Sequence, residues 1–440
     1  MIKKALILSL LVVLAASMTI SVSPPAQAQP PTDQDIQDAI DAGIAWLVAN
    51  QNSDGSWGTT EQVALTALAV KKLEHHCVDT KWGLGLPSPF DCPYSVNISN
   101  GLDYIFENAG IMAISPQLAG DPDSNGNGIG VYFQTSGTHR TYTTGLALMA
   151  IAETTTPNRV VDVSGSPVDG WTYKEVVQDA MEYLAFAQND AGPERGGWGY
   201  YENQVGWSDN SNSGFAVLGL QYAQADPPEG FQITIPQFVK DELCYWINYI
   251  QYMIPGSDYG GSGYSSGSPT QWIDIYKTGT LLREMEFAGG ACGSEQAAID
   301  YLIGHWNDAN VDPGWKGASY PSGVSDYLGM YSTMKGLVAQ GYVDPAVIDG
   351  INWQDDFDTA LVTQQLGDGS WPVTTWTDSV LSTEFALLIL QKVVPPPPTP
   401  QPPPAIPTLS QWGVIAMGIL LAAALIWSVR RRWVTSAGKS

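Results

Sequence analysis

The feature that most constrains the fold of this chain is a short pattern that recurs along it. An aromatic–aliphatic pair is followed by glutamine and then by Gly-x-Trp, most clearly at Trp46-Leu47, Gln51 and Gly55-Ser56-Trp57. The pattern returns, with degenerate copies, at six anchors: Trp46, Tyr104, Tyr183, Trp246, Tyr301 and Ala360. Consecutive anchors lie 55 to 79 residues apart. This spacing leaves room for two helices and two loops in each unit.

Each unit between residues 33 and 394 predicts one amphipathic helix and one helix that is apolar nearly all round. The first type is seen at Ile36, Ile40 and Ile44, which lie at helical intervals. The second type is seen at 63–68, and it returns at 145–151, 215–220 and 385–390. A helix without a polar face is expected to be buried. The second helices should therefore form an inner ring and the first an outer ring, with an open helical solenoid as the alternative.

The pattern has a mechanical explanation. A glutamine at the end of an outer helix can bond unpaired backbone groups there or at the start of the next helix. The glycine permits the turn. The tryptophan covers the junction with a large apolar face.

These residues resemble the QW repeat of squalene–hopene and related triterpene cyclases and of protein prenyltransferase β subunits. The resemblance covers about 360 residues, most of the chain. It implies an all-α, (α/α)6 toroid of about six helical hairpins, whose working cavity lies at one end of the inner ring. Fold alone does not assign an activity.

The sequence lacks the residues that carry the chemistry of these families. No Asp-x-Asp-Asp acid occurs, and the nearest pair, Asp355-Asp356, suits a solvated helix start. The expected inner-helix starts near 142–144, 212–214, 331–333 and 381–383 hold no Cys or His for zinc. The run 292–296 resembles the thioester motif of complement-like toroids but has one extra residue between Cys292 and Gln296. The sequence thus favours a non-catalytic binding or structural module. The rival is an enzyme that uses the inner ring, either a terpenoid-cyclase relative or a glycan-active hydrolase or lyase.

A ligand site is expected where the inner helices start. Four carboxylates and several aromatic residues fall near these starts, and together they suit a glycan or an apolar ligand. Helix capping would also explain the carboxylates. The candidate residues are Asp209, Asp274, Asp326, Asp378, Trp207, Tyr264 and Tyr320, with Tyr200, Tyr201 and Tyr259 nearby in sequence.

A candidate Ca²⁺ loop lies at residues 121–128. Its oxygen-bearing side chains alternate at Asp121, Asp123, Asn125 and Asn127, and the sixth position is glycine. Position twelve is Tyr132, which is not acidic. A polar turn without metal is the alternative.

Four cysteines are consistent with an oxidising compartment and two disulfides. Cys77 and Cys92 bracket a Gly- and Pro-rich loop, which favours the pairs Cys77–Cys92 and Cys244–Cys292. Three pairings satisfy the sequence.

Both ends of the chain predict targeting. Residues 1–28 have the charged start, apolar stretch and small-x-small site of a signal peptide, with an uncleaved anchor as the alternative. A Pro-rich linker at 395–405 leads to residues 406–434, whose apolar run 414–429 and following arginines predict one transmembrane helix with the toroid on the outer side. The tail resembles the IPTL-type C-terminal sorting signal, which implies a processing enzyme as partner; a plain anchor is the alternative. Its motif residues are Ile406, Pro407, Thr408, Leu409 and Trp412.

The charge of the exported part excludes one class of partner. Six of the 19 Lys and Arg residues lie in the two end segments, whereas all 44 Asp and Glu residues lie between them. The region between the ends therefore carries 13 basic and 44 acidic residues, a net charge of −31. This field repels phosphate backbones, so we expect no binding to nucleic acid.

Overall fold

The computed structural model describes residues 30–393, except 135–138, 203, 205, 229, 291, 310–312, 318–322 and 375–377. This part of the chain contains twelve α-helices, two 3₁₀ turns and two short antiparallel hairpins. The outer helices are α1 (Asp33–Ala49), α3 (Ser95–Glu107), α5 (Tyr173–Ala187), α7 (Gln237–Ile250), α9 (Glu295–His305) and α11 (Trp353–Gln364). The inner helices are α2 (Gln62–Val78), α4 (Arg140–Glu153), α6 (Asn210–Gln224), α8 (Ile275–Phe287), α10 (Tyr327–Ala339) and α12 (Ser379–Leu390). The 3₁₀ turns are η1 (Pro89–Asp91) and η2 (Pro269–Gln271).

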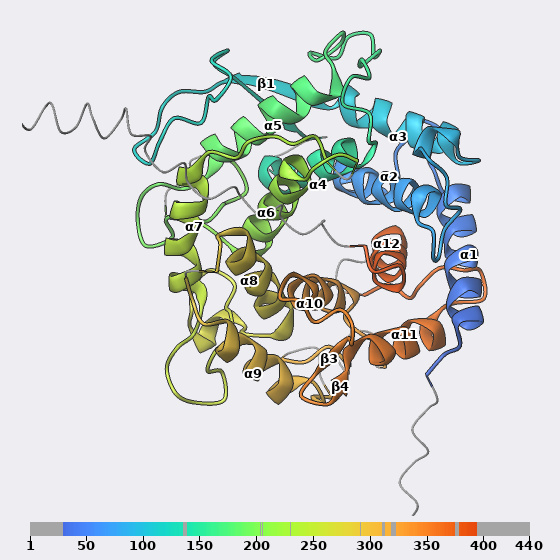
Figure 1. Ribbon diagram of the computed structural model, residues 1–440, viewed down its shortest axis with the longest axis vertical. Helices are drawn as coiled ribbons and strands as arrows, with labels where there is room; N and C mark the ends of the chain where they lie inside the picture. Colours follow the sequence, from blue (N-terminus) through green and yellow to red (C-terminus); the bar gives the residue numbers. More distant parts are fainter. Residues whose placement is uncertain are drawn as a thin grey trace, which may run out of the picture.

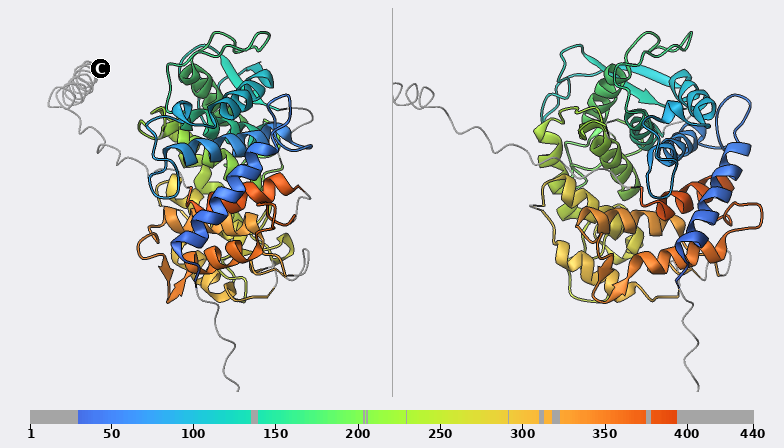
Figure 2. Two further views of the ribbon diagram at one scale, coloured as in Figure 1. Left: turned by 90° about the vertical axis from the view of Figure 1, so that its right-hand side faces the viewer. Right: turned by 45° about the vertical axis from the view of Figure 1, so that its right-hand side comes forward.

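The helices alternate between two concentric rings, which confirms the predicted toroid (Figure 1). Each inner helix packs against the inner helices of the neighbouring hairpins, and α12 packs against α2. The first outer helix, α1, contacts both α11 and α12, and Figure 2 shows these segments from opposite ends of the chain side by side. The ring is therefore closed, and the open solenoid is excluded.

Glycines allow the inner helices to approach closely in pairs. A methyl group on Gly219 of α6 would collide with the backbone of Gly145 in α4. Gly336 of α10 meets Gly279 of α8 in the same way. The small residues of the apolar segments therefore bring backbones into direct contact, which larger side chains would prevent.

The recurring glutamines join four of the six outer helices to the next one in the ring. Gln188 follows α5, and its amide group donates to the carbonyl oxygens of Gly196 in its own loop (2.9 Å) and of Val239 in α7 (3.0 Å). Gln51 makes the same two bonds between α1 and α3, and Gln251 makes them between α7 and the cap of α9. Gln365 joins α11 to Ala39 of α1 and so closes the outer ring. These bonds confirm the expected role of the glutamine.

The tryptophans of the three strict copies are fully buried, and each makes the same type of indole hydrogen bond. The indole N–H groups of Trp57, Trp198 and Trp371 donate to carbonyl oxygens of the preceding outer helix at 2.8 to 2.9 Å. Each backbone N–H donates to a Thr or Ser hydroxyl of the inner helix that follows. Each tryptophan thus locks the two helices of its own hairpin together.

The two degenerate copies use other devices. After α3 the chain forms a hairpin of β1 (Ala109–Ala113) and β2 (Ile129–Phe133), so the Gly130-Val131-Tyr132 segment is a strand. A second hairpin, β3 (Val347–Ile348) with β4 (Ile351–Asn352), precedes α11. Between α9 and α11, the indole of Trp306 donates to Asp356 at 2.7 Å.

Both predicted disulfides are present, Cys77–Cys92 and Cys244–Cys292. Within the part of the chain that is described, no helix has the length and apolar composition of a membrane span. The predicted signal peptide, the Pro-rich linker and the expected transmembrane helix at 406–434 lie outside the described residues.

We expect substitution of Gln188 by Ala to lower the free energy of unfolding by about 2–3 kcal/mol, because two buried carbonyl groups lose their donor. Denaturant titration measures this change. Gln34, which is exposed on α1 and bonds only Asp38 of its own helix, provides the control. Its change to Ala should cost less than about 0.5 kcal/mol. Equal effects of the two changes would contradict the joining role.

Candidate functional site

The predicted carboxylates all stand at N-cap positions of inner helices, so they lie around one end of the ring. Asp209 caps α6, Asp274 caps α8, Asp326 caps α10 and Asp378 caps α12. Three of them accept a hydrogen bond from a backbone N–H of the first turn, at 2.9 Å for Asp209, 2.9 Å for Asp274 and 2.7 Å for Asp378. Capping therefore explains the position of these residues in the sequence.

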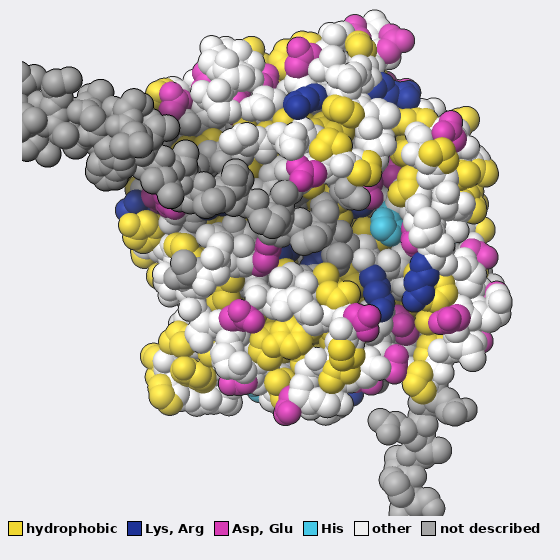
Figure 3. All heavy atoms as spheres, viewed as in Figure 1, with side chains coloured by type: hydrophobic (Ala, Val, Ile, Leu, Met, Phe, Trp, Pro, Cys, Tyr) yellow, Lys and Arg dark blue, Asp and Glu magenta, His cyan; other side chains and the backbone are white. Residues whose placement is uncertain are grey.

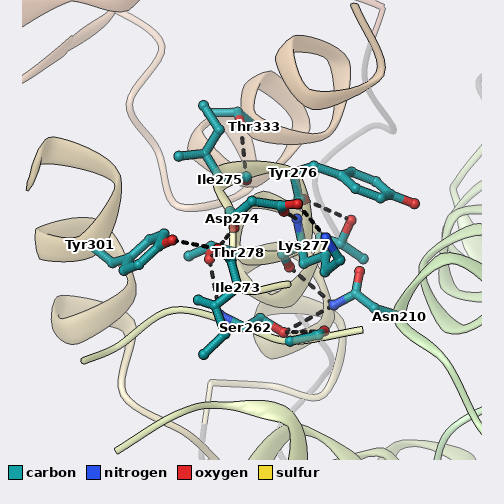
Figure 4. Close-up of polar contacts among 12 residues, drawn as sticks. Asn210, Ser262, Ile273, Asp274, Ile275, Tyr276, Lys277, Thr278, Tyr301 and Thr333 are labelled. Carbon is teal, nitrogen blue, oxygen red and sulfur yellow. Dashed lines mark hydrogen bonds and ion pairs between the residues drawn. The ribbon is translucent and has the colours of Figure 1, made fainter. Parts of the chain in front are cut away.

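Asp209, Asp274 and Asp326 form one acidic group around Tyr276. Burial, and then the charges of these three carboxylates, raise the pKa of Tyr276 well above its usual value. Asp274 forms an ion pair with Lys277, and a network through Ser262 and Asn210 connects this pair to α6 (Figure 4). The Tyr276 side chain extends away from this network (Figure 4).

The carboxylates of this group are largely engaged. Asp209 is fully buried and also accepts from the Ser211 hydroxyl at 2.6 Å and the Asn212 amide at 2.7 Å. Burial raises the pKa of Asp209, against the effect of these donors. Burial also raises the pKa of Asp326 to about 6, and the neighbouring Asp274 adds to the shift.

Asp378 lies apart from this group, near the seam where the ring closes. It lines a surface pocket of about 270 Å³ together with Trp46, Asn50, Asn52, Gly58, Thr59, Ser379 and Val380. The structure therefore divides the four predicted carboxylates into three that share one location and one that does not.

The aromatic residues at this end lie close together. The hydroxyls of Tyr264 and Tyr200 are 3.1 Å apart, and Trp272 lies edge-on to Tyr264 with ring centres 6.5 Å apart. Trp207 is 40% exposed two residues before the cap Asp209, and Trp272 is 61% exposed. Tyr320 lies outside the described residues. Exposed indole rings beside bonded carboxylates therefore mark this end of the ring.

Sequence reasoning missed Trp272 and the pair Glu61–His139. His139 Nδ1 lies 2.8 Å from Glu61 Oε1, and the imidazole packs against Tyr142 and Tyr200 at centroid distances of 5.5 and 4.9 Å. Glu61 and Trp272 both have a left-handed backbone, with φ of 46° and 49°. Such strained residues cluster at binding sites. In the sequence, only their positions just before expected inner helices could have indicated that Glu61 and Trp272 lie at this end of the ring.

The candidate Ca²⁺ loop is a hydrogen-bonded turn on α5. The Asp123 carboxylate accepts from the backbone N–H groups of Gly126 and Gly128 at 2.8 and 2.9 Å. The side-chain amides of Asn125 and Asn127 donate to Asp179 at 2.6 and 2.9 Å. Asp121 accepts from the Asp123 N–H, and Glu182 accepts from Ser124 and Asn125. These bonds already engage the loop oxygens, which favours the turn that needs no metal.

Other metal and covalent chemistry is not supported by the residues present. Among residues 30–393, outside the gaps given above, no three His, Cys, Asp or Glu side chains are grouped to hold a metal ion. The thioester reading of 292–296 is excluded because Cys292 is bonded to Cys244.

Comparison with known proteins identifies a motif in the tail and finds solved structures of weak similarity to the ring. Residues 404–432 match the IPTL-CTERM motif, so the chain carries this C-terminal sorting signal. No curated protein sequence is significantly similar to the chain.

Several solved structures are weakly similar over most of the chain. They include a family 76 α-mannanase of Bacteroides thetaiotaomicron, with 10% identity, a TM-score of 0.49 and coverage of 81% of this chain and 94% of that one. An inactive α-1,6-mannanase variant of a Salegentibacter species, in complex with α-1,6-mannotriose, has 12% identity, a TM-score of 0.48 and coverage of 81% and 98%. A type II terpene cyclase of Scytonema has 14% identity, a TM-score of 0.47 and coverage of 82% and 98%. Similarity this weak does not assign an activity, and the toroid stands on its own helix contacts.

We expect a chelator to leave the thermal unfolding midpoint unchanged, because the loop oxygens bond protein groups. Substitution of Asp179 by Ala should lower the free energy of unfolding by about 2 kcal/mol, because two amide donors lose their acceptor. Calorimetry of the wild type with EDTA, and again with added CaCl₂, measures the effect of the chelator. Calorimetry of the Asp179 variant measures the loss of stability. A midpoint that falls with EDTA and recovers with calcium would contradict this prediction and establish the ion.

Proposed function

We propose that this chain is an exported, membrane-tethered binding protein that holds a glycan at the inner-helix starts without cleaving it. The observation that carries the proposal is the contrast between two kinds of side chain at this end. The indoles of Trp207 and Trp272 are exposed, whereas Asp209 and Asp274 are already bonded. Aromatic faces bind the apolar faces of sugars, and the surrounding polar groups suit their hydroxyls.

Glycoside cleavage is the second candidate. Hydrolysis ordinarily requires two carboxyl groups at a defined separation, one as acid and one as base or nucleophile. The more exposed titratable pair here, Glu61 and His139, supplies one carboxylate. The strained backbones of Glu61 and Trp272 favour an active site, and the engagement of Asp209 and Asp274 favours binding. We therefore prefer binding.

The acidic surface supports an exported, soluble head on a tether. Acidic side chains are spread over the face in Figure 3 and are not gathered in one patch. The sorting motif at 404–432 supports processing by a partner enzyme, and the apolar run within it supports anchoring in the cytoplasmic membrane with the toroid outside.

Substitution of Trp272 by Ala should weaken glycan binding at least tenfold, because an exposed stacking surface is lost at a site with few alternatives. Affinity electrophoresis of the purified chain, in gels that contain mannan, dextran or pectin, measures retardation. Tyr245, which is 52% exposed on outer helix α7, provides a matched control, and its change to Ala should have no effect. Release of reducing sugar by the wild type would overturn the non-catalytic proposal.

Deletion of residues 406–440 should move the protein from the membrane fraction to the soluble fraction, because the only predicted span is removed. Cell fractionation with immunodetection measures this change. A truncated protein that stays in the membrane fraction would contradict the C-terminal tether and favour the uncleaved N-terminal anchor.

A further inference from the structure

Three buried cations of the inner ring, Arg283, Lys335 and Lys72, form no ion pair in the described part of the chain. The Arg283 side chain of α8 and the Lys335 side chain of α10 are 2% and 3% exposed, and in the described part of the chain no carboxylate lies within ion-pair distance of either. Two other buried cations are neutralised, Lys71 by Glu153 at 2.5 Å and Lys277 by Asp274. Lys72 of α2 has no hydrogen-bond partner; burial lowers its pKa, and the charge of nearby Asp79 raises it.

Arg283 and Lys335 converge on the same segment of α6. One guanidinium nitrogen of Arg283, Nη2, donates to the carbonyl oxygen of Gly214, while Nε and Nη1 have no hydrogen-bond partner. The Lys335 ammonium lies 5.6 Å from the ring centre of the adjacent Phe215 and 3.6 Å from that of Tyr331. Arg283 is close enough to lower the pKa of Lys335, which burial already places well below its usual value. Arg283 and Lys335 therefore share one part of the ring interior, where two guanidinium nitrogens of Arg283 are unbonded.

A row of aromatic rings connects the exposed rim to this pair. Successive neighbours in this row are Trp272, Tyr264, Tyr200, His139, Tyr142, Phe215 and Lys335. Tyr276 and Arg283 are seven residues apart on α8, so they share one face of the helix, two turns from each other. Side-chain contacts and one helix face therefore connect Arg283 and Lys335 to the proposed glycan site.

Buried charges are ordinarily paired, because an uncompensated charge away from water is strongly unfavourable. The lack of an ion pair is unexpected here, because the exported part has 44 acidic residues and only 13 basic ones. We propose that Arg283 and Lys335 bind the oxyanion, carboxylate or sulfate, of an acidic glycan. A planar guanidinium with free N–H groups suits such an oxyanion. The oxyanion site rests on the two cations alone, whereas its assignment to a glycan rests on the proposed function.

The test uses the purified full chain and small probes. Thermal unfolding and tryptophan fluorescence are followed with sodium galacturonate, galactose, sodium sulfate and sodium chloride at matched ionic strength. Galacturonate and sulfate should raise the unfolding midpoint by about 2–4 °C near saturation, and galactose and chloride should not. Stabilisation by galactose as large as that by galacturonate, or no response to either galacturonate or sulfate, would overturn the oxyanion site.

Two variants separate specific binding from general salt effects. Lys335→Met and Arg283→Gln should each abolish the responses to galacturonate and sulfate. Without anion, Lys335→Met should unfold at or above the wild-type temperature, because it removes a buried, unpaired charge. Arg195→Gln, at an ion pair on the outer surface, should leave the responses intact. Anion responses that persist in both inner-ring variants would overturn the proposal.

The remaining outcomes distinguish this inference from the proposed function. A response to sulfate without one to galacturonate would keep the oxyanion site and overturn the acidic-sugar assignment. A galacturonate response without Trp272-dependent retardation in polysaccharide gels would keep the oxyanion site and overturn the role of the aromatic rim.

Discussion

The fold depends on a two-acceptor hydrogen bond from a single glutamine amide. The bond to its own loop fixes the end of one outer helix, and the bond to the next outer helix fixes the neighbour, as at Gln188. Because both acceptors are backbone carbonyls, the bond sets the direction in which each hairpin follows the previous one. Four of the six steps around the ring use this bond, and the last glutamine, Gln365, reaches the first helix and so closes the ring.

The inner ring adds a different constraint. Two pairs of its helices, α4 with α6 and α8 with α10, touch through glycines, so a larger side chain at these positions would collide with backbone. The same helices nevertheless carry charged residues far from bulk water, among them Lys71, Glu153, Glu284 and Arg283. Burial raises the pKa of Glu284 to about 8, so this carboxyl is largely neutral near pH 7. A helix that reads as apolar in sequence can therefore hold the most costly groups of the molecule.

The sequence predicted the ring because its repeats have a regular local spacing, and it predicted the disulfides because Cys77 and Cys92 bracket one loop and leave Cys244 to pair with Cys292. Gln51 and Trp57 act within one hairpin, or between two neighbours, and their positions repeat. The pair Glu61–His139 joins residues 78 positions apart through a contact that no repeat encodes. Trp272 depends on a left-handed backbone, which residue type does not predict for tryptophan. The pairing of loop 121–128 with Asp179 is likewise tertiary. Sequence spacing could therefore locate the end of the ring that matters, but it could not predict which side chains meet there.

The seam between the first and last hairpins has a consequence for biogenesis. The amide of Gln365 bonds the carbonyl of Ala39, 326 positions earlier, and α12 packs against both α1 and α2. The earliest helices thus cannot complete their packing until nearly all of the toroid has left the ribosome. Until then, the apolar flank of α1 remains uncovered and open to association with other chains. Because the ring closes on itself, the first helices complete their packing only when the last ones are present. We therefore expect the incomplete toroid to be the form that most needs a chaperone.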